Sequence, residues 1–552
     1  MESFDPLMYS RAAEEGRQQQ SAEAGFSRFI AAIHPVEPRA SRAAILHFGG
    51  SFEWVRQSAI FPTLNVIDLG EITPQAKEFA GRHGLSIAIL AAICKEEVGF
   101  AGKGARRPVW TAEDYVAADV IRKGTGENIQ FRSYPHAFLQ AGGFVTIDPF
   151  TGERLVSTHS FVMHDTHIAY RFLGLEVFYI VVGGIGGFIR FCCIPRLQCL
   201  ILNSVPYEGA AHKAWSIDTY YRLMAELARS GEKLLEILPT PRHATGVAVG
   251  FLRNFGHYIW QDLAGIGEII ETHGVDAVQY IVAGPFSKLS VTEVFPELVG
   301  RPMVVCNDPF GAFDIAVGLP CQFIRPLGLF LRQTMRERIY RVAEAHVPPD
   351  LQRRIAQLAE SRFLIWVNLR SHNKTWVRQV EGHISVLRRL AGDVCNLTVL
   401  LDGWTDTQLV AEAIRAGLEP EIGVIDLIGC DVFETFLWSK AAHLYSVVVG
   451  TGLWFVSYFA SRPGVAHGNA WHLGQQRFWK FVARESCPPT FLKASDVNDN
   501  GELYSNYDFD PDILYWHLRH LIETHYPERL LAKREVPALE NPGVERDQGS
   551  AT

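Results

Sequence analysis

Residues Tyr445 to Asn469 read YSVVVGTGLWFVSYFASRPGVAHGN, and their pattern decides the fold class. Ser446 to Val449 is a short apolar, β-branched run of the kind that forms a buried parallel strand. Gly450-Thr451-Gly452 allows a tight turn, Leu453 to Ser461 can supply a helix, and Arg462-Pro463-Gly464 stops that helix. The stretch therefore predicts a strand, a loop, a helix and a second strand.

The glycine turn in this stretch is a candidate phosphate site. Such a turn places free backbone N–H groups and the positive end of a helix dipole at the carboxyl edge of a sheet. Phosphates bind at that edge in open α/β folds, so Gly450, Thr451 and Gly452 are candidate phosphate-binding residues. The alternative is that the glycines only permit close packing of strand and helix, because a lone Gly-x-Gly is a weak motif.

The same alternation runs through the last half of the chain. Strands alternating with helices of about ten residues indicate βαβ units and a parallel sheet. The expected strands are 363–368, 397–401 and 422–427, and the expected helices are 376–390, 407–416, 432–443 and 511–525.

The first half of the chain is more varied. It begins with a small α/β section, and from about 128 to 205 short alternating runs broken by Gly, Pro and Asp predict a β-rich section. The α/β pattern then returns, and a charged helical stretch links it to the last half. The expected elements of this part are helices 216–235 and 257–272, strands 245–251, 277–283 and 303–306, and helical residues 327–361.

Composition excludes several classes of protein. The chain has 552 residues, of which 48% are hydrophobic and 20% are charged, which is typical of a large globular protein with two or three domains. A net charge of -8 gives no broad field for nucleic acid. Nine cysteines without CxxC spacing predict reduced thiols in a cytosol.

The N-terminal residues have neither a basic flank nor an apolar core, so no signal peptide is recognisable. The most apolar run, Val177 to Ile189, is too short to span a bilayer, and its glycine-rich centre suggests two strands around a turn. A cytoplasmic protein without a transmembrane segment is therefore expected. Peripheral association with a membrane, or with a complex, stays open.

The ends of the four C-terminal strands are expected to face one crevice, because ligands of a doubly wound sheet lie at the carboxyl ends of its strands. Arg370 and Lys374 follow the first of these strands, and both are charged hydrogen-bond donors suited to binding a diphosphate. The alternative is that both are solvated loop charges. The four strand ends are Arg370 to Lys374, Asp402 to Trp404, Gly429 to Asp431, and Gly450 to Gly452.

The segment Asn254 to Asp262, NFGHYIWQD, places a histidine and an aspartate at the start of an expected helix. Together with the basic loop and the late strand-Gly-x-Gly-helix, it resembles the GT-B glycosyltransferases. The segments 254–262 and 439–453 look most like glycosyltransferase family 61, and the resemblance spans roughly 240–475. It implies two Rossmann-like lobes, the C-terminal one holding a nucleotide-sugar donor and the N-terminal one holding the acceptor.

The implied organisation is an α/β, GT-B-like fold with a β-rich N-terminal section. Its expected parts are a polar lead-in (1–40), an N-terminal α/β and β-rich section (41–210), an N-terminal Rossmann-like lobe with linking helices (211–360), a C-terminal Rossmann-like lobe (361–536) and a disordered tail (537–552).

The resemblance implies transfer of a sugar to a saccharide or glycoconjugate acceptor, with inversion, in polysaccharide or glycoconjugate assembly. One group must take the acceptor's proton, and positive groups must stabilise the departing diphosphate. His257 is the candidate base, and Asp262 would orient it or replace it. The alternative for His257 is a capping or packing role.

In the donor site that the resemblance implies, Arg370 and Lys374 would neutralise the diphosphate. Trp404 would stack on the base, and Glu434 or Asp431 would accept hydrogen bonds from the ribose hydroxyls. Fixed cationic side chains and a helix terminus would do what a metal ion does elsewhere, so neither a metal nor another cofactor is expected.

A competing hypothesis is a metal site in residues His159 to His167, HSFVMHDTH. Three imidazoles and a carboxylate this close together would suit a hydrolase or an oxygenase. On a strand, His159, Asp165 and His167 face one side and His164 the other, so convergence needs a turn at His164-Asp165. A structural β-section that lines the acceptor cleft is the alternative.

A third hypothesis is a two-lobed binding protein without turnover. Family 61 usually carries a histidine in the late turn, whereas Val449 to Leu453 contains none. A donor-dependent enzyme would hydrolyse its donor and be stabilised by a nucleoside diphosphate, a metal hydrolase would lose activity with a chelator, and a scaffold would do neither.

Overall fold

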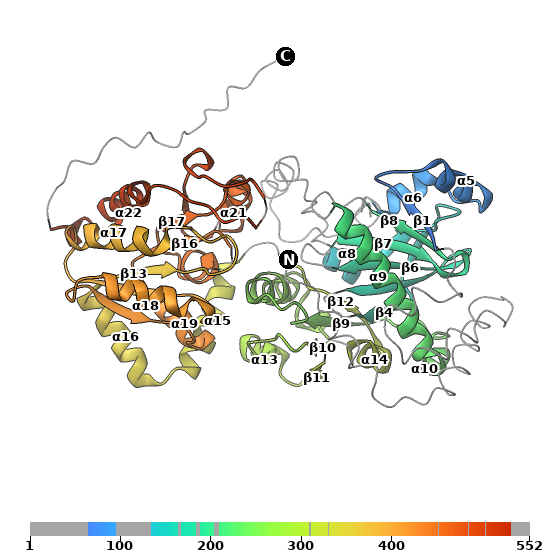
Figure 1. Ribbon diagram of the computed structural model, residues 1–552. Coiled ribbons are helices and arrows are strands. Elements are labelled where there is room, and N and C mark those ends of the chain that lie inside the picture. Colours follow the sequence, from blue (N-terminus) through green and yellow to red (C-terminus); the bar gives the residue numbers. More distant parts are fainter. Residues whose placement is uncertain are drawn as a thin grey trace, which may run out of the picture. The chain divides into compact units, whose positions relative to one another are not determined.

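The computed structural model describes residues 64–94, 134–163, 167–183, 188–203, 209–308, 311–328, 331–450, 452–483, 485–502 and 504–531 (Figure 1). The chain divides between Leu329 and Phe330 into two compact units, named unit 1 and unit 2 below. The lead-in 1–40 and the tail 537–552 lie outside the described residues.

The boundary between the units lies before the two linking helices, whereas the sequence analysis expected a lobe boundary at residue 360. The two linking helices are α15 (Gln333–His346) and α16 (Pro349–Ser361). Both pack on α19 (Val432–Ala441), and α16 also packs on β13 (Phe363–Asn368). They therefore belong to unit 2 and not to the N-terminal lobe.

Unit 2 is built on one six-stranded parallel sheet, in the order β15-β14-β13-β16-β17-β18. Its strands are β13, β14 (Leu397–Asp402), β15 (Gly423–Asp426), β16 (Leu444–Val448), β17 (Gly464–His467) and β18 (Thr490–Phe491). The helices are α15, α16, α17 (Gln379–Ala391), α18 (Gln408–Gly417), α19, α20 (Ala470–Leu473), α21 (Gln476–Val482) and α22 (Pro511–His525). The predicted alternation of strands and helices is confirmed, including strand, helix and strand within 445–469.

The central strands of this sheet are apolar because helices cover both of their faces. Every residue of β13, FLIWVN, is buried, as is every residue of β16, LYSVV. Such continuous apolar runs are what a parallel sheet between two helical layers requires. One group of helices in contact is α17, α18 and α22, and another is α15, α16 and α19.

The strand order of unit 2 reverses between β13 and β16. The chain passes from β13 to β14 and β15 in one direction, then returns to place β16 on the other side of β13. Crevices outside the carboxyl ends of strands at such a reversal are where ligands of open α/β sheets bind. The loop after β13 and the turn after β16 therefore flank the crevice.

Unit 1 contains a smaller parallel sheet with the same reversal, in the order β11-β10-β9-β12. Its strands are β9 (Ala244–Val249), β10 (Tyr280–Ala283), β11 (Met303–Val305) and β12 (Cys321–Ile324). Strand β12 was not expected from the sequence. After β9 comes a continuous helix made of α11 (Phe255–His257), a π-helical segment (Tyr258–Leu263) and α12 (Ala264–His273).

The expected β-rich section is confirmed as a six-stranded mixed sheet, β1-β8-β7-β6-β5-β4, in which β1 and β8 are parallel and the others antiparallel. Its strands are β1 (Asn65–Asp68), β4 (His159–Val162), β5 (Ile168–Leu173), β6 (Val177–Gly183), β7 (Phe188–Ile194) and β8 (Cys199–Leu202), and a separate hairpin joins β2 (Val145–Ile147) to β3 (Arg154–Val156). The apolar run from Val177 is thus two strands, as predicted.

This mixed sheet and the parallel sheet form one unit because their edge strands meet. The backbone N–H of Phe323 in β12 donates to the Ser160 hydroxyl in β4. Ser157 donates to the Gln322 amide oxygen (2.7 Å), which explains how a polar residue is accommodated in the buried strand β12. The described residues of both sheets therefore lie in one compact unit.

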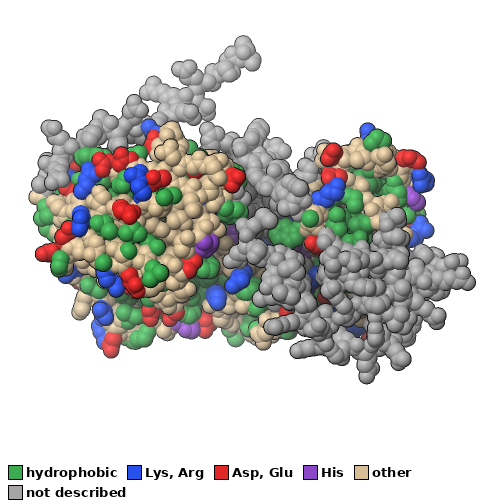
Figure 2. Space-filling model, viewed as in Figure 1, with side chains coloured by type: hydrophobic (Ala, Val, Ile, Leu, Met, Phe, Trp, Pro, Cys, Tyr) green, Lys and Arg blue, Asp and Glu red, His purple; other side chains and the backbone are tan. Residues whose placement is uncertain are grey.

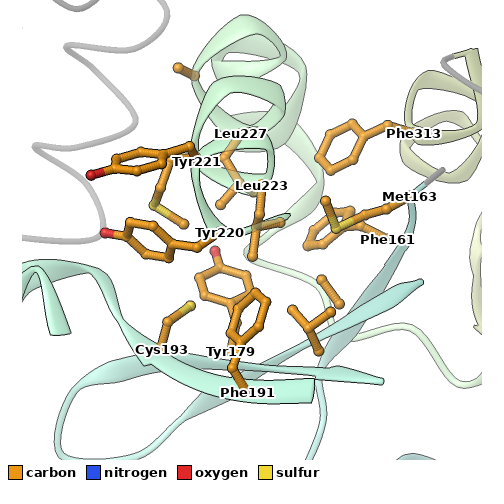
Figure 3. Packing of buried hydrophobic residues seen from close by; sticks show 14 of the residues in the cluster. Phe161, Met163, Tyr179, Phe191, Cys193, Tyr220, Tyr221, Leu223, Leu227 and Phe313 are labelled. Atoms are coloured by element: carbon orange, nitrogen blue, oxygen red, sulfur yellow. The ribbon is translucent and has the colours of Figure 1, made fainter. Parts of the chain in front are cut away.

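Helix α9 (Gly209–Arg229) closes the core of unit 1 (Figure 3). Tyr220, Leu223 and Leu227 project from α9 over Tyr179 and Phe191 of the mixed sheet, and all five are buried. Side chains of this size dominate the hydrophobic stabilisation of a core. The other helices of unit 1 are α5 (Pro74–Arg82), α6 (Ile87–Cys94), α8 (Tyr134–Ala141), α10 (Gly231–Ile237), α13 (Val291–Val294) and α14 (Ala312–Gly318).

The nine cysteines all lie in the described part of the chain and all are free, in agreement with the predicted reduced thiols. Six of them are buried, which is usual for cysteine as a small apolar side chain. Among the described helices, none combines the length and the apolar character needed to cross a bilayer.

Candidate functional site

Arg370 and Lys374 converge on Gly450 at the strand-order reversal of unit 2. A Cβ atom at Gly450 would lie 3.3 Å from Arg370 Nη2 and 3.3 Å from Lys374 Nζ. The two positive groups, from the loop after β13, thus lie against the turn after β16. The predicted proximity of these three donor-site residues is seen in the structure.

Neither of these cations forms an ion pair with a carboxylate of the described residues, taking 4.0 Å as the limit. Burial, followed by the neighbouring positive charge of Arg370, lowers the pKa of Lys374 to about 7. Burial also lowers the pKa of Arg370, although Tyr507, Asp402 and Asp406 act in the opposite direction. Two partly buried like charges at one place form a site that favours an anion.

The loop that carries the two cations is held in shape by side chains on both sides. The Gln379 amide donates to the Arg370 carbonyl oxygen (2.6 Å) and accepts from the Arg370 backbone N–H (3.2 Å). Ser371 donates to Asp406 (2.5 Å). Lys374 has a φ of 50°, in the left-handed region that is unfavourable for a residue with a side chain. Such strain is found at functional sites more often than elsewhere.

Gly450→Ala is expected to weaken anion binding at this site about tenfold. Gly450 has a φ of 145°, and an added methyl group would press on both cations. Isothermal titration with inorganic diphosphate measures the change in affinity. Gly429→Ala is the matched control, since Gly429 also has a positive φ, of 84°, but has no atom within 4 Å of its Cβ position. An equal loss in both variants would contradict the assignment.

Gly452 permits close packing of the turn against β13, and its predicted role in donor binding stays a prediction. A Cβ atom at Gly452 would lie 2.8 Å from Asn368 Oδ1, at the end of β13. Asn368 also donates to Asp402 Oδ2 (2.8 Å), and burial raises the pKa of Asp402 to about 6. Thr451 lies outside the described residues, so its predicted role stays a prediction.

The proposed ribose ligands lie at the edge of the sheet. Asp431 caps α19, because its side chain accepts from the backbone N–H groups of Phe433 and Glu434 at 2.8 Å each. The cap uses only Oδ1 of Asp431, and its predicted role with the ribose stays a prediction. Glu434, in the first turn of α19, follows β15, which is three strand spacings from β16, about 14 Å. Strand order therefore does not bring Glu434 next to Gly450.

Trp404 follows β14 and is 61% exposed, which is unusual for so large an apolar side chain. Its carbonyl oxygen accepts from Thr407, so the backbone is fixed while the ring faces solvent. An exposed ring at the carboxyl edge of the sheet is available for stacking, and its role with the donor base stays a prediction.

Sequence reasoning missed His472, which enters the same crevice from the strand on the other side of β16. His472 lies in α20, directly after β17, and is 7% exposed. Burial, then the positive charges of Lys374 and Arg370, lowers the pKa of His472 to about 3. The signal present in the sequence is an asparagine three residues earlier, Asn469, which caps α20.

In unit 1, His257 lies at the start of the helix that follows β9, as predicted. It is half-buried, and its ring lies 5.5 Å from the Trp260 ring, measured between centroids. Asn254 caps this helix by accepting from the His257 backbone N–H (3.2 Å). The next turn is π-helical, a distortion that is frequent at functional sites. The role of His257 as a base stays a prediction.

Asn254→Ala is expected to lower the free energy of unfolding by about 1 kcal/mol, because the first turn loses its side-chain acceptor. Urea denaturation followed by circular dichroism measures this change. Asn254→Ser keeps a capping oxygen and should lose only a few tenths of that amount. Similar losses in both variants would show that the cap is not what Asn254 supplies.

Asp262 is buried in an ion pair, which corrects its predicted catalytic role. It is 1% exposed, its Oδ1 lies 3.2 Å from Arg325 Nε, and its Oδ2 accepts from the Gly250 N–H (2.8 Å). Burial raises the pKa of Asp262, while Arg325 and Gly250 oppose that change. With both oxygens engaged, this carboxylate anchors the end of β9 to the residue that follows β12.

The metal hypothesis for His159 to His167 is not supported by the described residues. Both ring nitrogens of His159 have protein partners, the Thr158 hydroxyl (3.1 Å) and the Ile237 carbonyl oxygen (3.1 Å). Burial lowers the pKa of His159 to about 4. His164 and Asp165 are not described, and no group of three or more potential ligands that could hold a metal occurs among the residues that are.

On the face shown in Figure 2, acidic and basic side chains are interspersed over the described surface. This distribution agrees with the overall charge of -8. An anion site on such a protein depends on a few positive side chains, such as Arg370 and Lys374, and not on a broad positive field.

No protein-family model matches the chain, and no curated protein matches it. Similar solved structures include a glycosyl transferase family 9 protein from Veillonella parvula DSM 2008, at 11% identity over 51% of this chain and 98% of that one, with a TM-score of 0.32. The E. coli ADP-heptose lps heptosyltransferase II matches at 11% identity over 55% and 82%, with a TM-score of 0.27. The glycotransferase of kitacinnamycin matches at 12% identity over 48% and 73%, with a TM-score of 0.22. None of the three is described as a family 61 enzyme, and similarity at this level assigns the chain to no family.

Proposed function

We propose that unit 2 binds the diphosphate of a nucleotide-sugar donor and that the protein transfers the sugar to a saccharide or glycoconjugate acceptor. One observation carries the proposal. Arg370 and Lys374 lie together against Gly450, at the strand-order reversal, without a carboxylate partner among the described residues. Their mutual repulsion is relieved when an anion binds between them.

A diphosphate suits these two side chains better than a single carboxylate does. Arg370 offers a planar fork that binds two phosphate oxygens, and Lys374 offers a compact point charge. When a sugar leaves a nucleoside diphosphate, negative charge grows on the phosphate oxygens, and fixed positive groups stabilise that charge. The cations would thus serve both ground-state binding and the departure of the leaving group.

The acceptor chemistry in this proposal belongs to unit 1. His257 would take the proton of the acceptor hydroxyl during an inverting transfer. The resemblance of residues 254–262 to family 61, and the position of His257 at the carboxyl end of β9, support this part of the proposal. Asp262 takes no part in the proton transfer, because its oxygens are held by Arg325 and Gly250.

The experiment is a thermal-shift panel with nucleoside diphosphates and common nucleotide sugars, with and without EDTA, followed by assays of donor hydrolysis and sugar transfer. A ligand that binds only the folded protein raises its melting temperature. Stabilisation that survives EDTA, together with turnover, supports the proposal. Stabilisation without turnover would indicate a binding protein, and activity lost with EDTA would favour a metal-dependent function.

A further inference from the structure

The His472 ring is held in one tautomer by Asn469. The Asn469 side-chain oxygen accepts from the His472 backbone N–H (3.0 Å) and lies 2.7 Å from its Nδ1. The orientation of the Asn469 amide is set independently, because its nitrogen donates to the carbonyl oxygens of Glu502 (3.1 Å) and Ser505 (3.2 Å). An oxygen facing Nδ1 means that Nδ1 carries the proton.

The other ring nitrogen, Nε2, is therefore an acceptor. Among the residues that the structure describes, no hydrogen-bond donor reaches it, although the side chain is only 7% exposed. Nε2 is not one of the fully buried side-chain atoms without a partner, so a ligand or water can still reach this nitrogen and supply the donor. The ring stays neutral at physiological pH, because burial and the charges of Lys374 and Arg370 lower its pKa to about 3.

The His472 side chain lies close to the anion site, since the charges of Lys374 and Arg370 both act on its ring. The Cβ position of Gly468 lies 3.5 Å from the Val449 side chain and 3.7 Å from the His472 Cβ, so His472 adjoins the end of β16. The segment that fixes Asn469 also holds the cationic loop, since the Lys374 backbone N–H points to the Tyr504 carbonyl oxygen (3.4 Å). The segment from Glu502 to Ser505 thus contacts both the cationic loop and the asparagine that orients the His472 ring.

Two other functions of an open imidazole nitrogen fit poorly here. A general base needs a pKa near the working pH, and the His472 ring is a much weaker base than that. A metal ion would be repelled by the two neighbouring cations, and among the described residues no group of three or more His, Cys, Asp and Glu could hold one. A neutral acceptor next to a phosphate site instead suits a hydroxyl group.

We infer that His472 Nε2 accepts a hydrogen bond from a hydroxyl group of the molecule whose phosphates are held by Arg370 and Lys374. The inference rests on the proposed donor site and adds a basis for selectivity. The cations alone would bind any diphosphate. The His472 Nε2 atom, as a hydrogen-bond acceptor, favours a diphosphate that carries a sugar hydroxyl within reach. His472 is then a specificity-determining residue that discriminates against inorganic diphosphate.

The test uses two substitutions that separate the ring nitrogens. In His472→Asn, the shorter amide can still donate to Asn469 but leaves the Nε2 position empty. In His472→Gln, the longer amide can place an acceptor near the Nε2 position. The matched control is His525→Asn, at the last residue of α22. Isothermal titration of the full chain is done with inorganic diphosphate, with the nucleoside diphosphate that stabilises the wild type most, and with its nucleotide sugar.

We expect His472→Asn to weaken binding of the nucleoside diphosphate or its nucleotide sugar by roughly 3- to 10-fold, the value of one neutral hydrogen bond. Binding of inorganic diphosphate should stay within a factor of about two, and His472→Gln should recover most of the loss. A loss that affects both organic ligands identifies a ribose hydroxyl. A loss confined to the nucleotide sugar identifies a hydroxyl of the transferred sugar.

An equal loss for inorganic diphosphate would overturn the inference, because it would mean that His472 acts through Lys374. Unchanged binding of every ligand to His472→Asn would overturn it as well. If wild-type protein binds no nucleoside diphosphate or nucleotide sugar, the proposed function itself fails. The two failures are therefore distinguished by the wild-type titration alone.

Discussion

Lys374→Ala is expected to weaken binding of a nucleoside diphosphate by roughly 10- to 100-fold, the value of one hydrogen bond between charged partners. The ammonium group lies against Gly450 beside Arg370, where it has no carboxylate partner among the described residues, so its charge is available to a ligand. Isothermal titration at pH 6.5 measures the loss. Lys493→Ala, at an exposed lysine of unit 2, is the control and should bind as the wild type does. Unchanged affinity in Lys374→Ala would contradict the assigned site.

The same side chain gives the binding a characteristic pH dependence. In the empty site the pKa of Lys374 is about 7, and a bound anion raises it because the ammonium form is the one that binds. Affinity should therefore fall as pH rises above 7, by up to about tenfold per pH unit until the pKa of the complex is reached. Below about pH 6 affinity falls again, because the terminal phosphate takes up its second proton. Lys374→Arg, which keeps a charge at all these pH values, should remove the decline above pH 7.

The two units use the same strand reversal in different ways. In unit 1 the residue after β12, Arg325, is paired inside the protein with Asp262, which also holds the residue after β9, so the pair lies at the strand reversal. In unit 2 the equivalent crevice contains Arg370 and Lys374 without such a carboxylate among the described residues. A neutralised crevice offers little to an anion, whereas an uncompensated one attracts it. This contrast is the physical reason for assigning the anionic donor to unit 2.

The site in unit 2 could be predicted as far as strand order and loop position determine it. Arg370, Lys374 and Gly450 follow strands that are strongly apolar, and parallel strands bring such loops to one edge of a sheet. His472 could not be found this way, because its helix has four residues and its ring is oriented by Asn469. That asparagine is in turn held by residues more than thirty positions further along the chain.

The wrong expectations in the sequence analysis have identifiable physical causes. Asp262 was grouped with His257 because both lie on one short helical segment, but burial directs its carboxylate to Arg325, beyond a strand that the sequence did not reveal. Strand β12 was not expected because Gln322 interrupts its apolar pattern. The buried amide of Gln322 is satisfied by long-range hydrogen bonds, from the Ser157 hydroxyl to its oxygen and from its nitrogen to the Arg242 carbonyl oxygen. The capping role of Asp431 could have been predicted as well, because the sequence pattern of an N-cap is local.

His257→Ala is expected to lower kcat for sugar transfer by about 10²- to 10⁴-fold while leaving the affinity for the nucleoside diphosphate unchanged within a factor of about two. The reason is the separation of roles in the proposal. His257 lies in unit 1, at the carboxyl end of β9, whereas the cations that bind the diphosphate lie in unit 2. A group that accepts the proton of the acceptor hydroxyl contributes to the transition state and not to donor binding.

Steady-state transfer assays and donor titrations on the same preparation separate these two quantities. The control is His243→Ala, at an exposed histidine of unit 1, which should keep wild-type kcat. Urea denaturation of both variants accounts for any loss of folded protein, since His257 lies in the first turn of the capped helix. If His257→Ala transfers sugar at the wild-type rate, then His257 is a packing residue and another group removes the proton. If His257→Ala loses donor affinity in proportion to its loss of kcat, then His257 takes part in donor binding. The assignment of donor binding to unit 2 and of proton transfer to unit 1 would then be wrong.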